Sequence, residues 1–236
     1  SQIAQINQKG RKLQAKYLKT IFLKVKMESA IYSNQGDEYQ RLIALHWVVR
    51  LLYEDDLDWV QMEAIASPET QERILIEDIV VGYKDGHKLY IQAKKNQPGY
   101  RAWSLSDLKD MLFKAKNQFK NDPTGQVALY SRTPFGDLQK LREAVKLYES
   151  LSMFYTNASA VVKKIFDAFK HMLNISCEEA FNIMNQIIIG PHHTFEGWEE
   201  VVRNDLKQRF IRHNHAYVFL KDLVTQQGVR LNVIPK

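Results

Sequence analysis

A predicted β-hairpin constrains the fold of this chain more than any other segment. Two apolar runs rich in β-branched residues, residues 74–83 and 87–95, are separated by residues 84–86, whose sequence is Lys-Asp-Gly. Asp-Gly between two such runs is a strong signal for a tight turn that joins antiparallel strands. The segment therefore predicts a hairpin, and any fold of the chain must place these two strands side by side.

The length of the turn decides which residues of the two strands face each other. A two-residue loop would pair Lys84 with His87. A three-residue loop pairs Tyr83 with His87 and puts Gly86 in the left-handed conformation, which glycine adopts without a steric penalty. We favour the three-residue loop.

In the favoured register, three polar side chains share one face of the hairpin. Asp78 opposes Gln92 and Ile76 opposes Lys94, and side chains alternate between the two faces along a strand. Asp78, Gln92 and Lys94 therefore lie together among apolar neighbours. Burying such groups is costly unless they are paired or bound to a ligand, so this face is the first candidate for a functional site.

The rest of the chain predicts an α/β core followed by helices. After a break at residues 33–37, a helix is expected to about residue 53, and a strand at 59–65. A helix at 109–120 and a short buried strand at 126–131 come after the hairpin, an order typical of an α/β fold. From residue 137 onward the pattern is helical, over about 137–151, 157–173, 177–189, 196–212 and 215–226. A last run, residues 229–234, is a strand or a tail.

Composition limits the class of protein. The chain has 236 residues, of which 45% are hydrophobic, and a single cysteine, Cys177. It is long enough to bury a core as one large domain or two small ones, and one cysteine excludes a disulfide framework. No apolar run approaches the roughly 18 residues that span a bilayer, and there is no signal-peptide pattern. We expect a cytoplasmic protein with no membrane segment.

The basic charge is concentrated at the N-terminus. Residues 1–30 hold seven Lys and Arg residues against one acid, so the net charge of +6 belongs to this arm. Apolar residues recur there every four positions, which predicts an amphipathic helix over about residues 10–28. This helix is either docked with a solvated lysine face or in contact with the phosphates of a nucleic acid, where lysines release counterions.

Two interpretations of the polar hairpin face remain open. Asp78 and Lys94 could form a structural ion pair at the end of a sheet. Alternatively, the Asp78 carboxylate and the Gln92 amide oxygen offer hard ligands to Mg²⁺ or Mn²⁺. Such a metal lowers the pKa of a bound water and neutralises charge on a scissile phosphate. A lysine beside it stabilises the transition state.

The motifs on and before the hairpin resemble those of a known family. A helical Tyr-Gln, an acid on the second strand and Gln-x-Lys on the third are similar to the PD-(D/E)XK nuclease superfamily. They most resemble the double-stranded-DNA endonuclease domain of bacterial anti-phage effectors. That domain is fused to a SAVED cyclic-oligonucleotide sensor in CBASS effectors, and to or alongside HerA or NACHT ATPase modules in related systems. The residues that carry the resemblance, within about 34–135, are Gly36–Gln40, Glu63, Glu77–Ile79 and Ile91–Lys94.

The resemblance implies a fold and a domain organisation. It implies a restriction-endonuclease-like α/β core, with a central mixed sheet flanked by helices and a C-terminal helical extension. Residues 1–33 would be the basic helical arm, 34–136 the nuclease core, and 137–236 a helical extension packed on the core.

The resemblance also implies roles for residues of the hairpin. Asp78 would be the central metal ligand and Gln92 the second, with the backbone carbonyl of Ala93 a third. Lys94 would be the catalytic lysine. Gln92 stands where the superfamily usually has Glu or Asp. Because an amide binds a metal less strongly than a carboxylate, Glu63 or a further water would have to compensate.

Residues outside the hairpin are weaker candidates. Glu63 is either an additional metal ligand or an exposed strand carboxylate, and Gln40 either hydrogen-bonds into the site or lies on the surface. Contacts to nucleic acid are expected from Lys95, Arg101, Lys109 and Gln118. Trp103, in a polar loop after the proposed catalytic strand, is the tryptophan best placed to stack on a base.

The expected function is that of a metal-dependent DNA endonuclease with low sequence selectivity in anti-phage defence. Its expected partners are double-stranded DNA and a cyclic-oligonucleotide sensor or ATPase outside this chain, and we expect it to self-associate when active. The alternative is a catalytically inactive nuclease-like module that binds nucleic acid or a partner ATPase. An RNA-directed nuclease also remains open, because composition does not distinguish it.

Overall fold

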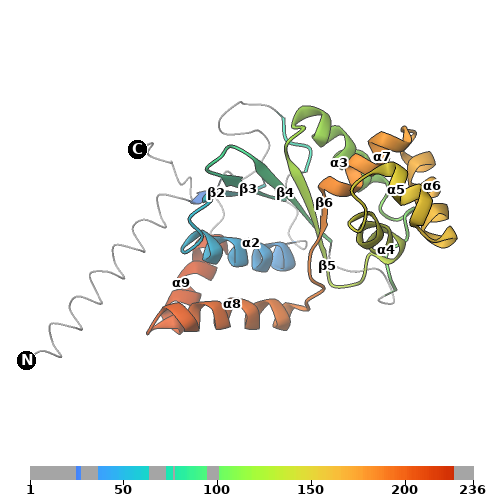
Figure 1. The fold of residues 1–236 in the computed structure, drawn as a ribbon. Helices are drawn as coiled ribbons and strands as arrows, with labels where there is room; N and C mark the ends of the chain where they lie inside the picture. Colours follow the sequence, from blue (N-terminus) through green and yellow to red (C-terminus); the bar gives the residue numbers. More distant parts are fainter. Residues whose placement is uncertain (1–24, 28–36, 64–72, 77, 95–100, 226–236) are drawn as a thin grey trace, which may run out of the picture.

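The computed structural model describes residues 25–27, 37–63, 73–76, 78–94 and 101–225. In this part of the chain a mixed sheet of six strands is covered by helices on both faces (Figure 1), which confirms the predicted α/β class. The strands lie side by side in the order in which they occur in the sequence. They are β1 (Val25–Met27), β2 (Leu57–Met62), β3 (Ile79–Tyr83), β4 (Lys88–Lys94), β5 (Gln126–Ser131) and β6 (Ile187–Ile189).

The centre of the sheet is antiparallel and its two sides are parallel. The strands β2, β3 and β4 run antiparallel to one another. The outer pairs β1–β2, β4–β5 and β5–β6 are parallel. Each parallel pair is joined by a crossover connection that carries a helix, as parallel strands require.

The structure confirms the three-residue hairpin loop. The Tyr83 N–H donates to the His87 carbonyl oxygen at 3.0 Å, and Gly86 has a φ of 91°. Ile79 pairs with Ile91, so Asp78 and Gln92 oppose each other one step further along.

The second strand begins later than the sequence predicted. It was expected from residue 74, but β3 begins at Ile79, and the pairing of β3 with β4 does not reach Ile76 and Lys94. The preceding segment turns onto a helix instead, because the Leu75 N–H donates to the side-chain oxygen of Gln118 at 2.8 Å.

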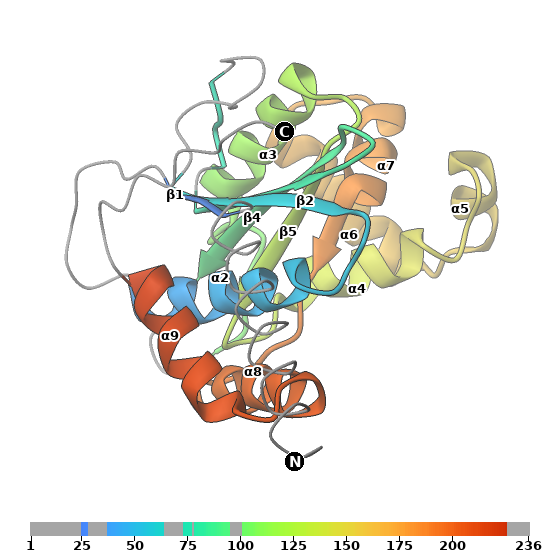
Figure 2. The same cartoon turned by 90° about the vertical axis from the view of Figure 1, so that its left-hand side faces the viewer.

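One face of the sheet is covered by three helices. They are α2 (Asp37–Leu51), which lies against the strands, and α8 (Phe195–Arg209) and α9 (His213–Thr225), which pack on α2. Buried apolar side chains from these helices meet Val60, Ile79, Val81, Leu89 and Ile91 of the sheet. Figure 2 shows α8 and α9 on the same side as α2.

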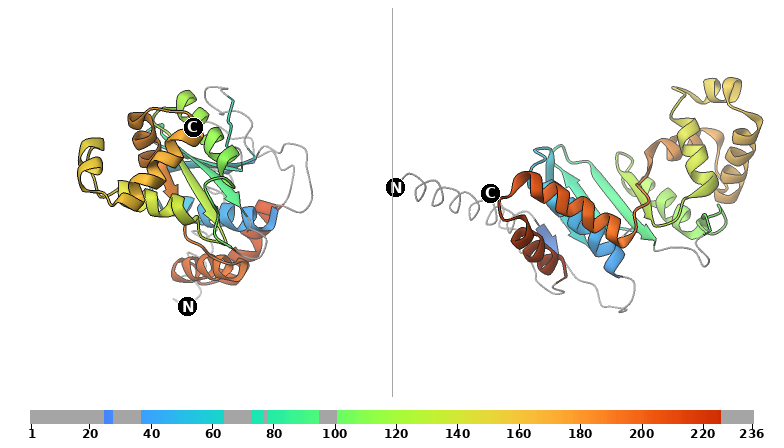
Figure 3. Two further views of the ribbon diagram at one scale, coloured as in Figure 1. Left: turned by 90° about the vertical axis from the view of Figure 1, so that its right-hand side faces the viewer. Right: turned by 90° about the horizontal axis from the view of Figure 1, so that it is seen from below.

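The opposite face is covered by the helices α3 to α7. They are α3 (Lys109–Asn121), α4 (Gly136–Val145), α5 (Leu151–Asn157), α6 (Ala160–Leu173) and α7 (Cys177–Gln186). Val80, Tyr90, Val127 and Leu129 point into this second apolar cluster. Figure 3 shows α4 to α7 gathered at one side of the molecule, away from α8 and α9.

Serine and threonine residues set the start of several of these helices. A hydroxyl oxygen at the N-cap accepts a backbone N–H from the first turn, which would otherwise lack a partner inside the helix. In the described chain this holds for α5, α6, α7 and α8, whose caps are Ser150, Ser159, Ser176 and Thr194.

The predicted helical extension is wrong in one respect. The helix expected over residues 177–189 ends at Gln186, and Ile187–Ile189 pair with β5 as the strand β6. Residues 137–225 thus complete the sheet and supply helices to both of its faces. They form part of the core as well as packing on it.

The N-terminal arm is described only in part. Val25–Met27 form β1 beside β2, where the end of an amphipathic helix was expected. The remainder of that predicted helix lies outside the described residues. So do the predicted boundary at residues 33–34 and the run at 229–234, which was expected to be a strand or a tail. None of the helices in the described ranges combines the length and apolar character needed to cross a membrane.

Candidate functional site

The predicted polar face of the hairpin is directed at α3. Asp78 is two residues from Val80, and Gln92 is two residues from Tyr90; Val80 and Tyr90 both belong to the cluster on the α3 side. Because side chains alternate along a strand, Asp78, Gln92 and Lys94 share this face. All three side chains are half-buried at one end of β3 and β4.

Asp78 is held by contacts from three elements. One oxygen of its carboxylate accepts the Ala93 N–H at 2.7 Å and also a bond from the Gln92 amide nitrogen. Its backbone carbonyl accepts the side-chain amide of Gln40 at 2.9 Å and the Glu63 N–H at 3.0 Å. Of the two alternatives for Gln40, the structure shows the hydrogen bond into the site from α2, and both the backbone and the side chain of Asp78 are held.

Glu63 lies directly opposite Asp78 at the end of β2. It has a φ of 49°, in the left-handed region that non-glycine residues seldom adopt. Such backbone strain persists only where the surrounding structure imposes it, and it is concentrated at functional sites. Glu63 is half-buried, and its backbone N–H bonds to the Asp78 carbonyl, so its backbone adjoins the site.

Lys94 lies beside Trp103. Its Nζ atom is 5.8 Å from the centre of the indole ring, which is within the range of a cation–π contact. The ammonium group therefore has an aromatic neighbour from the segment that precedes α3. The structural ion pair between Lys94 and Asp78 stays a prediction.

The donor atoms of this site fit a hard divalent cation. Asp78 supplies a carboxylate, and the Gln92 amide can present its oxygen by a half-turn about its terminal bond, because the two ends of an amide are assigned from the hydrogen-bond network. The N–H and C=O of one strand residue face the same neighbouring strand. Since the Ala93 N–H bonds to Asp78, the Ala93 carbonyl faces the same side.

The site contains few of the side chains that bind metals most strongly. Within the described ranges no group of three or more His, Cys, Asp and Glu residues could hold a metal. The candidate set has only two such residues, Asp78 and Glu63, and relies on amide and carbonyl oxygens for the rest. Oxygen ligands of this kind suit Mg²⁺ rather than zinc.

The residues expected to contact nucleic acid have different positions. Gln118 is buried, 2% exposed, and its oxygen holds Leu75; that prediction is wrong, because the side chain joins α3 to the segment before β3. Arg101 and Lys109 are exposed near the start of α3. Lys95 lies outside the described residues.

Arg101 already has an acidic partner. Its guanidinium contacts Asp107 at 2.8 Å. This contact and the bonds from Ser104 hold the pKa of Asp107 well below its usual range. A phosphate would therefore compete with Asp107 for Arg101.

The sequence did not single out Gln61, on β2. This side chain is 1% exposed, and neither atom of its amide has a hydrogen-bond partner among the described residues. It pairs with Val80 and so lies on the same face as Asp78. The sequence feature that could have indicated this residue is a glutamine inside an apolar predicted strand. A buried amide without hydrogen-bond partners needs a specific explanation.

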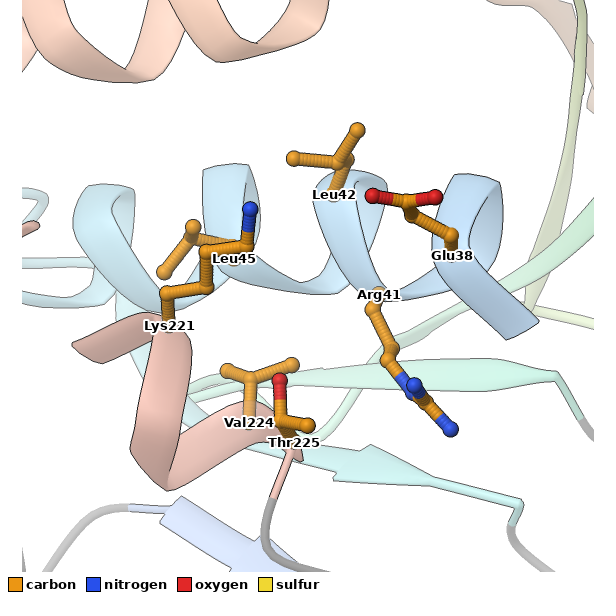
Figure 4. Close-up of a pocket in the computed structure, with 7 residues that line it drawn as sticks. All are labelled: Glu38, Arg41, Leu42, Leu45, Lys221, Val224 and Thr225. Carbon is orange, nitrogen blue, oxygen red and sulfur yellow. The ribbon is translucent and has the colours of Figure 1, made fainter. Parts of the chain in front are cut away.

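A pocket of about 260 Å³ lies on the other side of the molecule (Figure 4). It is formed between α2 and α9, with Leu42, Leu45 and Val224 as apolar walls. Charged side chains, among them Glu38 and Lys221, stand at its edge. Because α2 and α9 cover the face opposite to α3, this pocket is separate from the site around Asp78.

Known proteins resemble this chain in fold but not detectably in sequence. No family model matches the sequence, and no curated protein matches it. The structure is similar to the Cap4 SAVED/CARF-domain containing receptor of Acinetobacter baumannii, solved with the cyclic trinucleotide 3'3'3'-cAAA. The TM-score is 0.55 at 15% identity, and the match covers 82% of this chain and 41% of that chain.

A second similar structure is the Cap4 SAVED/CARF-domain containing receptor of Moraxella osloensis. Its TM-score is 0.52 at 13% identity, over 82% of this chain and 43% of that chain. The chain thus spans less than half the length of these receptors. At such identities the likeness shows a common fold.

Proposed function

We propose that this chain is a metal-dependent nuclease domain that hydrolyses phosphodiester bonds in double-stranded DNA. The observation that carries the proposal is the convergence of the Asp78 carboxylate, the Gln92 amide and the Ala93 backbone, with Lys94 on the same face. These residues are the ones on which the sequence resembles the PD-(D/E)XK superfamily. Their bonding from β2, β4 and α2 supports a preorganised site.

The residues of the chain have distinct tasks in this proposal. Asp78, Gln92, the Ala93 carbonyl and Glu63 would hold Mg²⁺ or Mn²⁺, and Gln40 fixes the backbone of Asp78. The metal, when bound, supplies an acidified water and charge neutralisation at the phosphate. Lys94 orients the attacking water and stabilises the negative charge that develops on the phosphate.

DNA would approach the site from the end of the sheet where β4 stops. Arg101 and Lys109 stand exposed on the next described segment. The basic residues of the N-terminal arm add charge for phosphate contacts. Such contacts position a duplex without reading its sequence, so we expect low sequence selectivity and a strong dependence on salt.

A nuclease of low selectivity has to be restrained in its own cell. The receptors of similar fold, one of them solved with a cyclic trinucleotide, favour a role in anti-phage defence under the control of a nucleotide signal. The sensor or an ATPase would lie outside this chain. We expect active molecules to self-associate in the cytoplasm.

The proposal is tested by plasmid cleavage. The chain is incubated with supercoiled plasmid, with Mg²⁺ or with EDTA, and compared with the variants Lys94→Ala and Asp78→Asn. We expect cleavage only with Mg²⁺ and a loss of about 100-fold or more in each variant. Lys207→Ala, on α8, is the matched control and should retain activity. Equal cleavage by the Lys94→Ala variant and the unaltered chain would contradict the assignment.

A binding module without activity is the second candidate. It is favoured by Gln92, a neutral residue whose amide already bonds to Asp78. Calorimetry separates the two: Mg²⁺ binding that Asp78→Asn abolishes supports the nuclease, whereas duplex binding without any metal binding supports the module. Structured RNA and 3'3'3'-cAAA serve as further ligands, and tight binding of the trinucleotide would place the sensor in this chain.

A further inference from the structure

Trp103 is held by β5 and by the residues that follow this strand. Its Nε1–H donates to the Ser131 hydroxyl at 2.7 Å, and Ser131 is 0% exposed. The Trp103 backbone N–H donates to the Pro134 carbonyl at 2.9 Å. Its carbonyl lies against Gly136, where an added Cβ would approach to 2.6 Å. Both the ring and the main chain of Trp103 therefore have a set position.

This fixed ring stands next to the proposed catalytic lysine. Lys94 and Ser131 are direct partners in the parallel pairing of β4 with β5. The indole that is anchored on Ser131 consequently lies beside Lys94, with the ring centre 5.8 Å from Nζ. The negative face of an indole attracts an ammonium group.

An aromatic neighbour can restrict the position of a lysine ammonium group. Its four-carbon stem has many rotamers, so an ammonium without restraint spreads over many positions. A contact with an aromatic face is not directional in the way a hydrogen bond is, because it acts on the charge of the ammonium. The ring of Trp103 can therefore restrict the ammonium while leaving its N–H bonds available for water or phosphate.

We propose that Trp103 is a positioning residue, which holds the Lys94 ammonium at the edge of the Asp78–Gln92 site. Ser131 acts with it by fixing the orientation of the ring. This inference rests on the proposed function for its catalytic consequence. The restriction of Lys94 itself is a property of the fold and is measurable without catalysis.

The first test measures how readily Lys94 reacts. The whole chain is labelled with an amine-acylating reagent, and the rate at Lys94 is followed by peptide mass spectrometry. We expect Trp103→Leu to raise that rate about threefold or more, because the ammonium loses its cation–π contact. Trp103→Phe keeps an aromatic face but loses the bond to Ser131, so its rate should lie between those of Trp103→Leu and the unaltered chain. Lys109, next to Phe113, is the internal reference.

The second test measures kcat and KM for plasmid cleavage. Trp103→Leu should lower kcat about tenfold and change KM little, since a misplaced lysine affects the transition state more than substrate binding. Trp103→Phe keeps an aromatic face and Ser131→Ala keeps the indole, but each loses the bond between Trp103 and Ser131, so both should give a loss smaller than that of Trp103→Leu.

The outcomes separate this inference from the proposed function. If Lys94→Ala abolishes cleavage but Trp103→Leu changes neither labelling nor rate, the positioning role is wrong and the nuclease stands. If Lys94→Ala cleaves normally, the nuclease assignment fails, and labelling alone still decides whether Trp103 restricts Lys94. Should Trp103→Leu not fold, Ser131→Ala decides, because unchanged Lys94 labelling in that variant contradicts the anchor.

Discussion

His46, on α2, shows how burial sets the protonation of a single residue. Its ring lies 5.2 Å from that of Trp198 and 5.9 Å from that of Trp47, measured between centroids. Burial, together with the nearby Arg50 and His193, lowers the pKa of His46 from 6.5 to about 4. Asp205 is 4.0 Å away but does not offset this. At neutral pH the folded chain therefore holds His46 uncharged.

The lowered pKa predicts a loss of stability in acid. The unfolded chain takes up a proton at His46 below pH 6.5, whereas the folded chain resists it until about pH 4. Stability from this residue is complete above pH 6.5 and is lost as pH falls towards 4, by about 3 kcal/mol in the free energy of unfolding. Urea unfolding of the unaltered chain and of His46→Phe between pH 4 and 7 measures it. Identical pH slopes for the two would contradict the prediction.

Arg142, on α4, is a buried cation with carbonyl partners. Its Nε donates to the Ile187 carbonyl, and one terminal nitrogen donates to that of Asn185 at 3.3 Å. These carbonyls end α7, where the helix dipole is negative and oxygens lack partners within the helix. The side chain thus ties α4 to the junction between α7 and β6.

Replacing Arg142 should destabilise the fold. Arg142→Met keeps the apolar stem but leaves the two carbonyls without donors, and we expect a loss of about 1–3 kcal/mol. Lys140→Met, on the exposed side of the same helix, is the control and should change stability little. Chemical denaturation followed by circular dichroism measures both variants. Equal stability of the two variants would show that water satisfies the carbonyls instead.

At the scale of elements, the packing of β2 against the hairpin depends on a glycine. Gly82 on β3 lies under the indole of Trp59 on β2, and an added Cβ would come within 2.1 Å of that ring. The two residues are direct partners in the pairing of β2 with β3. The Trp59 ring occupies the space that a side chain at position 82 would fill.

A methyl group at this glycine should therefore be costly. Gly82→Ala forces the Trp59 ring to move, with an expected loss of about 1–3 kcal/mol from overpacking. Gly197→Ala, where the nearest atom is at 3.3 Å and the site lies on a helix, is expected to be tolerated. Thermal unfolding of both variants tests this, and an unchanged midpoint for Gly82→Ala would mean that the ring has room to move.

Sequence patterns predict the structural features that are set by residues close together in the chain, such as turns and strand faces. The Asp-Gly turn and strand alternation were sufficient to place Asp78, Gln92 and Lys94 on one face. The strand β6 was missed because its three isoleucines continue the apolar pattern of α7. The contacts of Gln118 and Trp103 were not predictable, since each depends on a partner from a distant part of the chain.

The whole molecule depends on its C-terminal half for both helical layers. The helices α8 and α9 cover α2, while α4 to α7 cover the other face and β6 closes one edge of the sheet. Hydrophobic periodicity predicts that each of these segments is a helix, but it does not predict which face of the sheet each helix covers. The nuclease core expected at residues 34–136 thus shares its hydrophobic core with residues 137–225.

Truncation tests this dependence. A chain that stops after residue 136 loses the partners of both apolar clusters and should not unfold cooperatively, because too little apolar surface remains buried. Circular dichroism on heating, with a hydrophobic dye as a second probe, measures this. A sharp transition in the shortened chain would show that residues 34–136 fold independently.

The position of α8 and α9 under α2 has a consequence for biosynthesis. Gln40, which holds the backbone of Asp78, stands on a helix whose covering layer leaves the ribosome last among the described elements. At typical translation speeds that delay is roughly ten seconds or more. A nascent chain therefore contains the residues of the proposed site well before α8 and α9 are available to cover α2, the helix that carries Gln40.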